Sequence, residues 1–471
     1  MASHPTVFER QPPPDALVAA ALAETEHRVF WLDDARGLSH AALDGQLEAD
    51  LTVVGGGYCG LWTAVLAKRR DPSARVVLVE AETLGWAASG RNGGFAEASL
   101  THGAENGLSR WPDEYETLER LGAENLDAIE RDVVDLGMDC QFERNGTLSV
   151  AYDPHQVRWL QDETHGVYLD EAAVRAEIDS PIYRAGRWSK DDCALVHPAR
   201  LVHELARVAV DLGVQIHEHS AVTALDSGRA GPVVVRTARG SVRSATVALA
   251  TNVYRPLLRR TRLSTIPVYD YVLMTEPLDA TQRAAVGWKN RQGVADLANQ
   301  FHYSRPTQDQ RILYGGYDAI YHPGRKVLPE YEDRDSSYRR LAAHFLTTFP
   351  QLEGLRFSHR WAGPIDTSTQ FCAFHGLARR GRVAYAAGFT GLGVAATRFA
   401  AEVMLDRLEG ADTERTRLAM VRKKPLPFPP EPIATVGIKA TTWSLDRADH
   451  QEGHRNLLLR TLDRLGLGFD S

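Results

Sequence analysis

Long apolar runs, cysteine and excess positive charge are all scarce in this sequence. No stretch approaches the roughly 20 apolar residues that a membrane-spanning helix needs. The first 15 residues contain four prolines and no apolar core, so they do not resemble a signal peptide. The four cysteines, at positions 59, 140, 193 and 372, show neither a disulfide framework nor paired metal-ligand spacing. We therefore expect a reduced, cytoplasmic protein without a metal site.

Acidic residues outnumber basic ones, 61 to 54, and the formal net charge is -7. Nucleic acids and anionic membranes both favour a basic face, so neither is expected as a partner. Hydrophobic residues make up 44% of the chain and charged residues 24%, as in ordinary globular proteins. A chain of 471 residues is long for one core and predicts more than one domain, while the oligomeric state stays open.

The clearest local pattern is a strand, a glycine turn, a helix and a second strand. Residues 51–54 and 75–79 are short apolar β-prone runs, and residues 57–69 have a helical apolar face. Gly55, Gly57 and Gly60 fit G-x-G-x-x-G, in which glycines allow a tight turn and close backbone approach to a pyrophosphate. This order is that of a parallel βαβ unit.

Glu80 ends the second of these strands. A carboxylate in that place accepts the hydroxyls of an adenosine ribose, and the N-terminus of the preceding helix attracts phosphate. A glycine turn alone is weak evidence, but together with its two strands, its helix and Glu80 it predicts dinucleotide binding.

Further elements are expected along the chain. Helices are predicted at about 113–136, 155–178, 198–212, 335–348 and 392–408, and strands at 214–218, 232–237, 246–250, 269–275, 311–314 and 382–386. The proline-rich residues 424–430 cannot continue a helix and should run extended over a surface.

The segment LGWAASGRNGG, residues 84–94, is rich in small residues. Such a segment lets the backbone approach a large flat ligand and supplies N–H donors, although it could also be a flexible loop.

Four segments together resemble the glycine oxidase/D-amino-acid oxidase superfamily of FAD proteins. They are VVGGGYCGLWTA, LGWAASGRNGGF, RILYGGYDAIY and AAGFTGLGVAATRFAAEVM, in the order of the family. Within the superfamily they are most similar to the gamma-glutamylputrescine oxidase-like branch. The resemblance covers about residues 28–430.

The resemblance implies an α/β fold with two domains. A discontinuous, Rossmann-like FAD domain of the GR2 type would use residues 46–100, 190–255 and 356–410. An α+β substrate domain with an antiparallel sheet would use residues 101–189 and 256–355. Residues 1–45 would form an N-terminal arm and residues 411–471 a C-terminal extension.

The resemblance also implies where FAD is held. Glu80 would take the ribose, Ala88 to Gly94 would line the pyrophosphate and ring, Val222 would meet adenine, and Ala250 to Asn252 would lie on the flavin side. The full set of predicted cofactor-binding residues is Gly55, Gly57, Tyr58, Cys59, Gly60, Glu80, Ala81, Ala88, Ser89, Arg91, Asn92, Gly93, Gly94, Val222, Ala250, Thr251, Asn252, Gly388, Thr390, Gly391, Leu392, Gly393 and Val394.

The glycine cluster at residues 388–394 also has a physical interpretation of its own. It joins a predicted strand to a predicted helix, so it presents a helix N-terminus. N–H groups there would stabilise the negative charge of a reduced flavin, unless the cluster is a plain turn.

The implied reaction is oxidation of a C–N bond of an amine or amino acid by hydride transfer to the flavin, followed by hydrolysis of the imine. The amine must be neutral to release a hydride, and a desolvating aromatic pocket lowers its pKa. Tyr269 and Tyr271 are candidates for that pocket because residues two apart share one face of a strand, although both could instead pack in a core. NAD(P)-dependent dehydrogenation and a non-catalytic FAD-binding subunit are the alternatives.

Three further candidates, all with structural alternatives, complete the predicted catalytic set of Tyr271, His302, Arg305 and Asp366. His302 would be a base, Arg305 would line the pocket beside Tyr303, and Asp366 would pair with a cationic substrate or cap a turn.

The chain departs from the family at several positions. The segments WAGPIDTST and GFTGLGV lack Arg and Lys, so a carboxylate-bearing substrate is not favoured over an amine unless Arg91, Arg305 or Arg360 substitutes. Trp361 and Ala362 occupy the position of the flavin-linked cysteine of sarcosine oxidases, so we expect non-covalent FAD. The oxygen-activating lysine of those enzymes has no counterpart in residues 310–316, which leaves O2 or another electron acceptor open.

Overall fold

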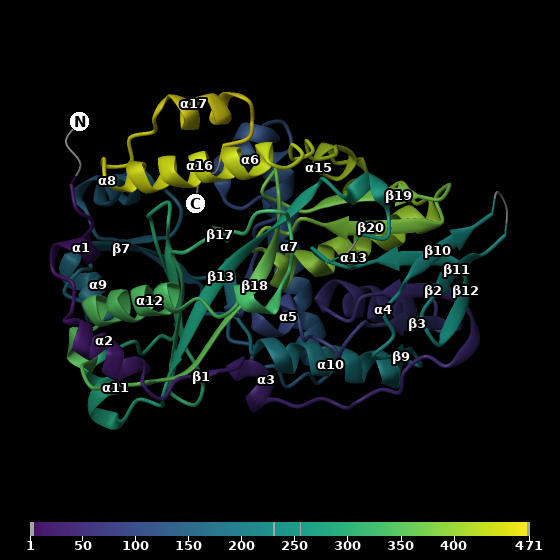
Figure 1. The fold of residues 1–471 in the computed structure, drawn as a ribbon, viewed down its shortest axis with the longest axis horizontal. Helices are drawn as coiled ribbons and strands as arrows, with labels where there is room; N and C mark the ends of the chain where they lie inside the picture. Colours follow the sequence, from purple (N-terminus) through teal and green to yellow (C-terminus); the bar gives the residue numbers. More distant parts are fainter. Residues whose placement is uncertain (1–3, 229–230, 255, 469–471) are drawn as a thin grey trace.

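Two large β-sheets and the helices around them form the protein (Figure 1). The structure is a computed structural model that describes residues 4–228, 231–254 and 256–468. One sheet has eight strands and carries the glycine turn, and the other has ten.

The eight-stranded sheet is parallel at its centre and antiparallel at one edge, in the order β10-β11-β12-β2-β3-β9, with β20 beside β12 and β19 beside β20. Its strands are β2 (Gly45–Val54), β3 (Val76–Val79), β9 (Gln215–His217), β10 (Ala224–Ser227), β11 (Val233–Arg236), β12 (Gly240–Leu249), β19 (Phe374–Ala378) and β20 (Val383–Ala387). Leu51 to Val54 pair in register with Val76 to Val79, and all eight residues are buried. This confirms the predicted parallel βαβ unit.

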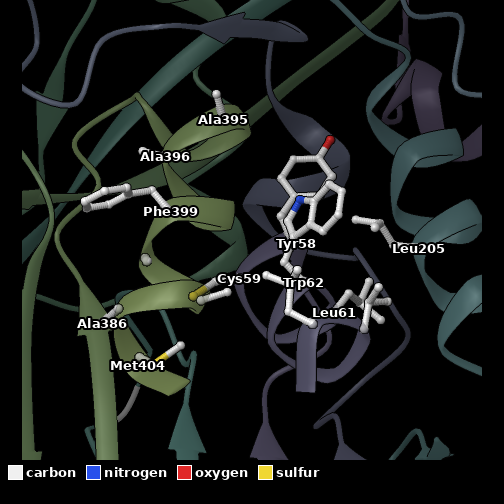
Figure 2. Close-up of a cluster of buried hydrophobic side chains, with 14 of the residues drawn as sticks. Tyr58, Cys59, Leu61, Trp62, Leu205, Ala386, Ala395, Ala396, Phe399 and Met404 are labelled. Atoms are coloured by element: carbon white, nitrogen blue, oxygen red, sulfur yellow. The ribbon is translucent and has the colours of Figure 1, made fainter. Parts of the chain in front are cut away.

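Helix α4 (Tyr58–Arg70) is buried between α10 (Pro198–Asp211) and α13 (Gly393–Glu409). Figure 2 shows Leu61 and Trp62 of α4 among side chains from both neighbours, including Leu205 and Phe399. A helix apolar on every side must be covered on every side, which explains why its apolar residues are not confined to one stripe.

The ten-stranded sheet is mixed and runs β1-β18-β13-β16-β15-β14-β5-β7-β6, with β17 beside β13. Its strands are β1 (Glu26–His27), β5 (Thr147–Ala151), β6 (Val167–Leu169), β7 (Ala185–Ser189), β13 (Thr265–Thr275), β14 (Gly293–Asp296), β15 (His302–Pro306), β16 (Ile312–Gly316), β17 (Ile320–Tyr321) and β18 (Phe357–Ser368). Helix α12 (Asp335–Thr348) packs on this sheet together with α1 (Val7–Arg10) and α2 (Asp15–Leu22).

Shorter elements complete the chain. They are α3 (Phe30–Asp34), α5 (Ala88–Arg91), β4 (Phe95–Glu97), α6 (Ala104–Arg110), α7 (Tyr115–Asp135), α8 (Pro154–Asp162), α9 (Glu171–Glu177), β8 (Cys193–Leu195), η1 (Arg259–Thr261), α11 (Ala280–Val286), η2 (Pro329–Tyr331), η3 (Pro350–Leu352), α14 (Glu414–Arg417), α15 (Ala419–Arg422), α16 (Ile433–Asp449) and α17 (Leu457–Arg464). Among the described residues, no helix combines the length and the apolar character that a membrane crossing requires.

Two sequence expectations differ from the structure. The single helix predicted at 155–178 is two helices, α8 and α9, with β6 between them, because Gly166 takes a φ of +81° that a helix cannot continue through. Residues 357–368, predicted within the FAD domain, pair with β13 in the ten-stranded sheet. The predicted N-terminal arm packs on that sheet, where Phe8, Val18 and Ala21 are buried in the core.

The division into domains therefore stays a proposal with two amendments: β18 is a strand of the larger sheet, and α1 and α2 pack against that sheet. The tail after residue 410 likewise contains helices that the sequence pattern does not predict, although residues 424–430 do run without helix or strand.

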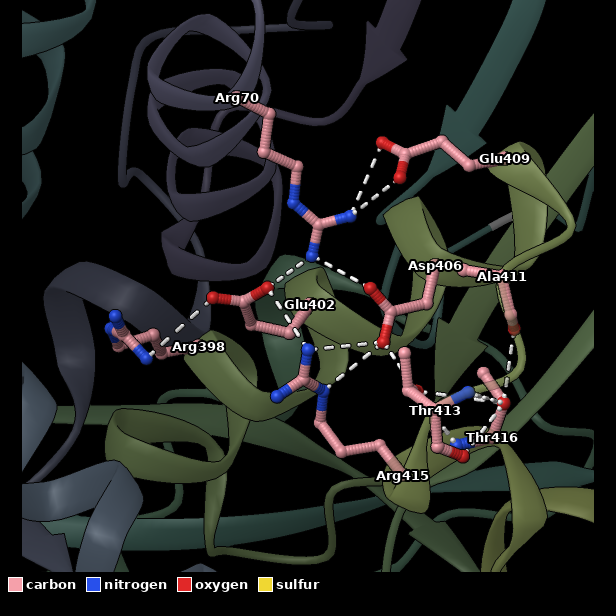
Figure 3. A network of polar contacts seen from close by, with 9 residues as sticks. All are labelled: Arg70, Arg398, Glu402, Asp406, Glu409, Ala411, Thr413, Arg415 and Thr416. Atoms are coloured by element: carbon pink, nitrogen blue, oxygen red, sulfur yellow. Dashed lines mark hydrogen bonds and ion pairs between the residues drawn. The ribbon is translucent and has the colours of Figure 1, made fainter.

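A cluster of ion pairs ties the end of α4 to α13 and α14 (Figure 3). The Arg70 guanidinium contacts Glu402, Asp406 at 2.8 Å and Glu409 at 3.1 Å. Arg415 of α14 contacts Asp406 from the other side at 3.0 Å. The side chain of Asp406 is only 4% exposed, so its charge needs both guanidinium partners.

Candidate active site

One large cavity, of about 1300 Å³, connects the glycine turn of β2 with the ten-stranded sheet. Pockets for small molecules usually occupy about 300–1,000 Å³, so this one has room for more than a drug-sized ligand. Its two ends differ in character: backbone and a carboxylate dominate at the glycine turn, and aromatic, acidic and apolar side chains dominate at the other end.

The glycine turn has no room for side chains. Gly55 has a φ of +113°, and a Cβ there would lie 2.3 Å from the Ala250 carbonyl oxygen. A Cβ on Gly57 would lie 2.7 Å from Ser89 Oγ, which accepts a hydrogen bond from the Tyr58 N–H at 3.0 Å. The residue 84–94 segment is thus locked against the first turn of α4, and the backbone of both is left bare to the cavity, as a pyrophosphate requires.

Glu80 is held at the end of β3 by three donors. Its carboxylate accepts from the Gly56 N–H at 2.6 Å, from Trp86 Nε1 at 2.9 Å and from the Glu82 N–H at 3.0 Å. The side chain lines the cavity while the residue is 7% exposed. Carboxylate oxygens can accept further hydrogen bonds, so this fixed acceptor suits the ribose of a dinucleotide.

The second glycine cluster, at the start of α13, closes around Asp366. The Gly388 N–H donates to Asp366 Oδ2 at 2.5 Å, and Gly391 has a φ of +95°. Burial raises the pKa of Asp366 to about 7, although the Gly388 N–H favours the charged form. Asp366 lines the cavity, and turn capping, one of its two predicted roles, is what its hydrogen bond performs.

Most predicted cofactor residues line the cavity. These are Gly55, Gly57, Tyr58, Cys59, Glu80, Ala81, Ala88, Ser89, Arg91, Asn92, Gly93, Val222, Ala250, Thr251, Asn252, Thr390, Gly391, Leu392, Gly393 and Val394. Gly60, Gly94 and Gly388 are not among the described lining residues. Gly60 and Gly94 lie against neighbouring backbone, where an added Cβ would approach a carbonyl oxygen to 1.9 and 2.3 Å, and Gly388 lies against Ser368 and Phe374.

The alternation along β13 was predicted correctly, but the face opposite the two tyrosines supplies most of the strand's cavity-lining residues. Ile266, Val268, Asp270 and Val272 line the cavity. Tyr271 belongs to the opposite face, is fully buried, and donates its hydroxyl to the Tyr331 carbonyl at 2.7 Å. Its contacts are those of the core alternative that the sequence left open, and the described cavity wall does not include it. Tyr269, on the same face, is buried in the same core but does line the cavity.

His302 and Arg305 are also placed away from the cavity. His302 Nδ1 lies 2.7 Å from Asp296 Oδ2, and its Nε2 lies 2.8 Å from His344 Nδ1. Both ring nitrogens of His302 thus have hydrogen-bond partners in the core, which is the structural alternative that the sequence left open.

Arg305 donates to the Val196 carbonyl at 2.6 Å and lies over the Trp31 ring at 5.6 Å. Burial lowers its pKa to about 10, which still leaves it charged at neutral pH. Arg305 fixes the loop beside Gly94 and is not part of the described cavity wall.

The acidic group on the cavity face of β13 is Asp270, which sequence reasoning missed. Tyr303 of β15 donates its hydroxyl to Asp270 across the intervening strand β16. The Tyr303 ring has room there only because Gly315 lies between: a Cβ on Gly315 would be 2.6 Å from Tyr303 Cζ. Burial raises the pKa of Asp270 to about 6, while the Tyr303 hydrogen bond lowers it.

A second carboxyl at the same end is Glu97 of β4, whose pKa burial and the nearby Asp192 raise to about 7. Arg91 is the sole Lys or Arg in the described part of the wall, and it is already paired with Glu332 at 2.5 Å. Burial lowers the pKa of His102, the histidine of this wall, and so keeps it neutral.

The C-terminal helices cover this end of the cavity. Their apolar contribution to the wall consists of Ile433, Ala434, Ile438, Ala440, Leu445, Leu458, Leu462 and Leu467. Within the described chain, α16 and α17 add no charged side chain to it. The sequence offered one signal, the helical spacing of Ala434, Ile438 and Leu445 after the proline-rich stretch.

Comparison with known proteins finds oxidoreductases. A family model described as FAD dependent oxidoreductase matches residues 50–407. Gamma-glutamylputrescine oxidoreductase of Escherichia coli is 30% identical over 79% of this chain and 86% of its own length. A probable oxidoreductase, OrdL, of Haemophilus influenzae is 28% identical over 77% of this chain and 84% of its own.

Solved structures of low sequence identity share the fold. Glycine oxidase from Geobacillus kaustophilus superposes with a TM-score of 0.63 at 19% identity, over 78% of this chain and 96% of that one. L-proline dehydrogenase from P. horikoshii has the same TM-score at 18% identity, over 79% and 96%. The mixed α/β architecture expected from the sequence is thereby confirmed.

Proposed function

Because the chain belongs to the FAD-dependent oxidoreductase family, we propose that it oxidises a C–N bond of an amine or amino acid. The substrate loses a hydride from its α-carbon and a proton from nitrogen, and water hydrolyses the resulting imine to a carbonyl compound and a free amine. The observation that carries the proposal is the continuous cavity that joins the glycine turn to the acidic end at Asp270. The relatives named for amine and amino-acid oxidation support the same reaction class.

FAD is the group whose dimensions and chemistry fit this cavity. Glu80 would accept the ribose hydroxyls, the bare backbone at Gly55 and Gly57 would hold the pyrophosphate, and the start of α13 would face the flavin ring. Bound FAD supplies the two-electron oxidant that no side chain can provide.

The residues of the substrate end prepare the amine. The Asp270 carboxylate can pair with an entering ammonium group and then take its proton, since burial has raised its pKa toward neutrality. Tyr303 stays protonated, because burial raises its pKa well above its ordinary value, and its hydroxyl fixes the carboxylate in place. The surrounding aromatic and apolar side chains exclude water and favour the neutral amine.

FAD is proposed to be held without a covalent bond. Cys59 is the cysteine of the described cavity wall, and burial raises its pKa far above the ordinary range, so its thiol stays protonated. Protonated thiols are poor nucleophiles. All four cysteines are buried and free, which suits the proposed cytoplasmic location.

Anaerobic reduction of the flavin tests the proposed reaction. A screen of amines, N-methyl amino acids and D- and L-amino acids should contain compounds that bleach the flavin absorption of the purified protein. A flavoprotein that no compound bleaches would be the non-catalytic alternative, and protein that takes up NAD(P) and no FAD would be the nicotinamide alternative. Admitting air afterwards shows whether O2 or another molecule accepts the electrons.

A further inference from the structure

The substrate end of the cavity has acidic groups at one side and apolar side chains of α16 and α17 at the other. We call these two helices the apolar cover. Asp270 and Glu97 are carboxyls, while Arg91, the wall's cation among the described residues, is neutralised by Glu332. A substrate carboxylate would find no unpaired cation there, and burying an unpaired charge is costly. An ammonium group, in contrast, meets the carboxylate of Asp270.

A chain of contacts through Val268 and Tyr321 leads from Asp270 to the start of the apolar cover. Val268 lies two residues from Asp270 on the same face of β13, about 7 Å away at the usual rise of a strand. Val268 pairs with Tyr321 of β17, and the Tyr321 hydroxyl donates to Glu431, directly before α16. The first turn of α16 is thereby fixed beside the cavity face of β13.

Two more contacts hold the cover in place. At the far end of α16 the His450 carbonyl accepts from the His4 N–H at 2.9 Å. After α17, the Gly466 carbonyl accepts from Arg110 at 2.5 Å. Between these anchors Ile438, Leu458 and Leu462 face the cavity (Figure 1 shows both helices along one side of the molecule).

The family match ends at residue 407, so α16 and α17 lie outside the matched region. We propose that α16 and α17 make the enzyme selective for amines with an extended apolar substituent and no carboxylate. The inference rests on the proposed oxidation of a C–N bond and names its substrate class. In this arrangement the amine nitrogen lies at Asp270 and the apolar substituent lies under α16 and α17.

A matched substrate series tests the selectivity on the complete FAD-loaded protein. Anaerobic flavin reduction is measured with butylamine, hexylamine and octylamine, and with 8-aminooctanoate as the carboxylate-bearing match of octylamine. The second-order rate constant of flavin reduction should rise about fourfold for each added methylene, because burying one CH₂ group contributes about 0.8 kcal/mol. It should be at least about tenfold lower for 8-aminooctanoate than for octylamine, because its carboxylate would be buried without a partner.

Binding is measured separately with an amine that lacks an α C–H bond, 2-methyloctan-2-amine. It cannot be oxidised, and it should shift the flavin absorption bands at lower concentration than its butyl counterpart 2-methylbutan-2-amine.

A paired substitution locates the selectivity in the cover. Ile438→Arg places a cation in the wall and should reduce the preference for octylamine over 8-aminooctanoate at least about tenfold. Val436→Arg, on the exposed side of the same helix, should leave the preference unchanged.

Rates independent of chain length, or faster reduction by 8-aminooctanoate, would overturn the inference while the proposed reaction stands. If no amine or amino acid reduces the flavin, the proposed reaction fails, and equal binding of the two non-oxidisable amines would then remove the inference as well.

Discussion

Tyr303 reaches Asp270 across a strand whose facing residue, Gly315, has no side chain. Tyr303 lies directly opposite Gly315 in the register of β15 and β16, and Gly315 lies opposite Val272 in β13. The ring therefore crosses β16 above a glycine to reach the carboxyl. This hydrogen bond fixes the position of the acid that we propose to receive the substrate, and it lowers the pKa of that acid against the larger effect of burial.

Asp270→Asn is expected to lower kcat/KM about 100-fold or more, because positioned proton transfer contributes at least that much. Since burial raises the pKa of Asp270 to about 6, wild-type kcat/KM should rise as the pH increases through about 6, where the carboxylate forms. The rise should be missing in Asp270→Asn. A pH profile between 5 and 9 measures it, and an unchanged profile in the variant would exclude Asp270 as the base.

Tyr303→Phe and Gly315→Ala should shift that profile in the same direction. The Tyr303 hydroxyl favours the charged form of Asp270, so its loss raises the pKa of the carboxyl and moves the rise in kcat/KM to higher pH. Gly315→Ala keeps the hydroxyl but brings a methyl group within 2.6 Å of Tyr303 Cζ, so the ring must move. If Gly315→Ala retained the wild-type dependence of kcat/KM on pH, the hydrogen bond between Tyr303 and Asp270 would not require a glycine at position 315.

Gly60→Ala should weaken FAD binding and destabilise the protein. The new Cβ would lie 1.9 Å from the Gly55 carbonyl oxygen, so α4 must move away from the turn that we propose to hold the pyrophosphate. Overpacking of this kind costs about 1–3 kcal/mol. Gly437→Ala is the control, because its Cβ would meet no atom within 4 Å. The FAD content after gel filtration and the thermal unfolding midpoint are the measurements; equal FAD content in both variants would contradict the expectation.

Asp366 should make the FAD-free protein less stable as the pH rises. Its folded pKa is raised to about 7 from the ordinary value of 3.8, so between these values the folded state holds a proton that the unfolded state has released. Folding stability due to this group is therefore present below about pH 4 and is lost as the pH rises to about 7, by at most about 1.4 kcal/mol per pH unit.

Asp366→Asn keeps an oxygen that can accept from the Gly388 N–H but carries no ionisable group. Its unfolding midpoint, compared with that of the wild type across this pH range, should decline less steeply. Parallel curves for the two proteins would show that Asp366 does not titrate in this range.

Acid precipitation should release the cofactor. Trichloroacetic acid unfolds the protein, and non-covalent FAD should then stay in a yellow supernatant above a colourless pellet. The expectation follows from the buried, protonated state of Cys59, and yellow colour in the washed pellet would refute it.

The sequence predicts the nucleotide end of the cavity well and the substrate end poorly, for physical reasons. The glycine turn depends on residues close in sequence, and Glu80 follows from the length of one βαβ unit. Strand β13 is different, because Val268, Tyr269, Tyr271 and Val272 are all apolar or aromatic and both of its faces are covered. Periodicity then shows which residues share a face but does not show which face borders the cavity.

Contacts between distant segments account for the remaining differences. Arg110 meets Gly466 and His4 meets His450, pairs that no local pattern connects. The proline-rich stretch before α16 indicates a break in regular structure, and it carries no information on where the next helix will pack.

The placement of α16 and α17 separates substrate preference from folding of the core, two properties that usually change together. Their anchors lie at the ends of the helices, and the cores of both sheets are built almost entirely by earlier parts of the chain. We therefore expect substitutions on the cavity side of α16 and α17 to change substrate preference while the sheets that we propose to hold FAD still fold. Different side chains at these positions would then give different substrate preferences around one oxidising centre.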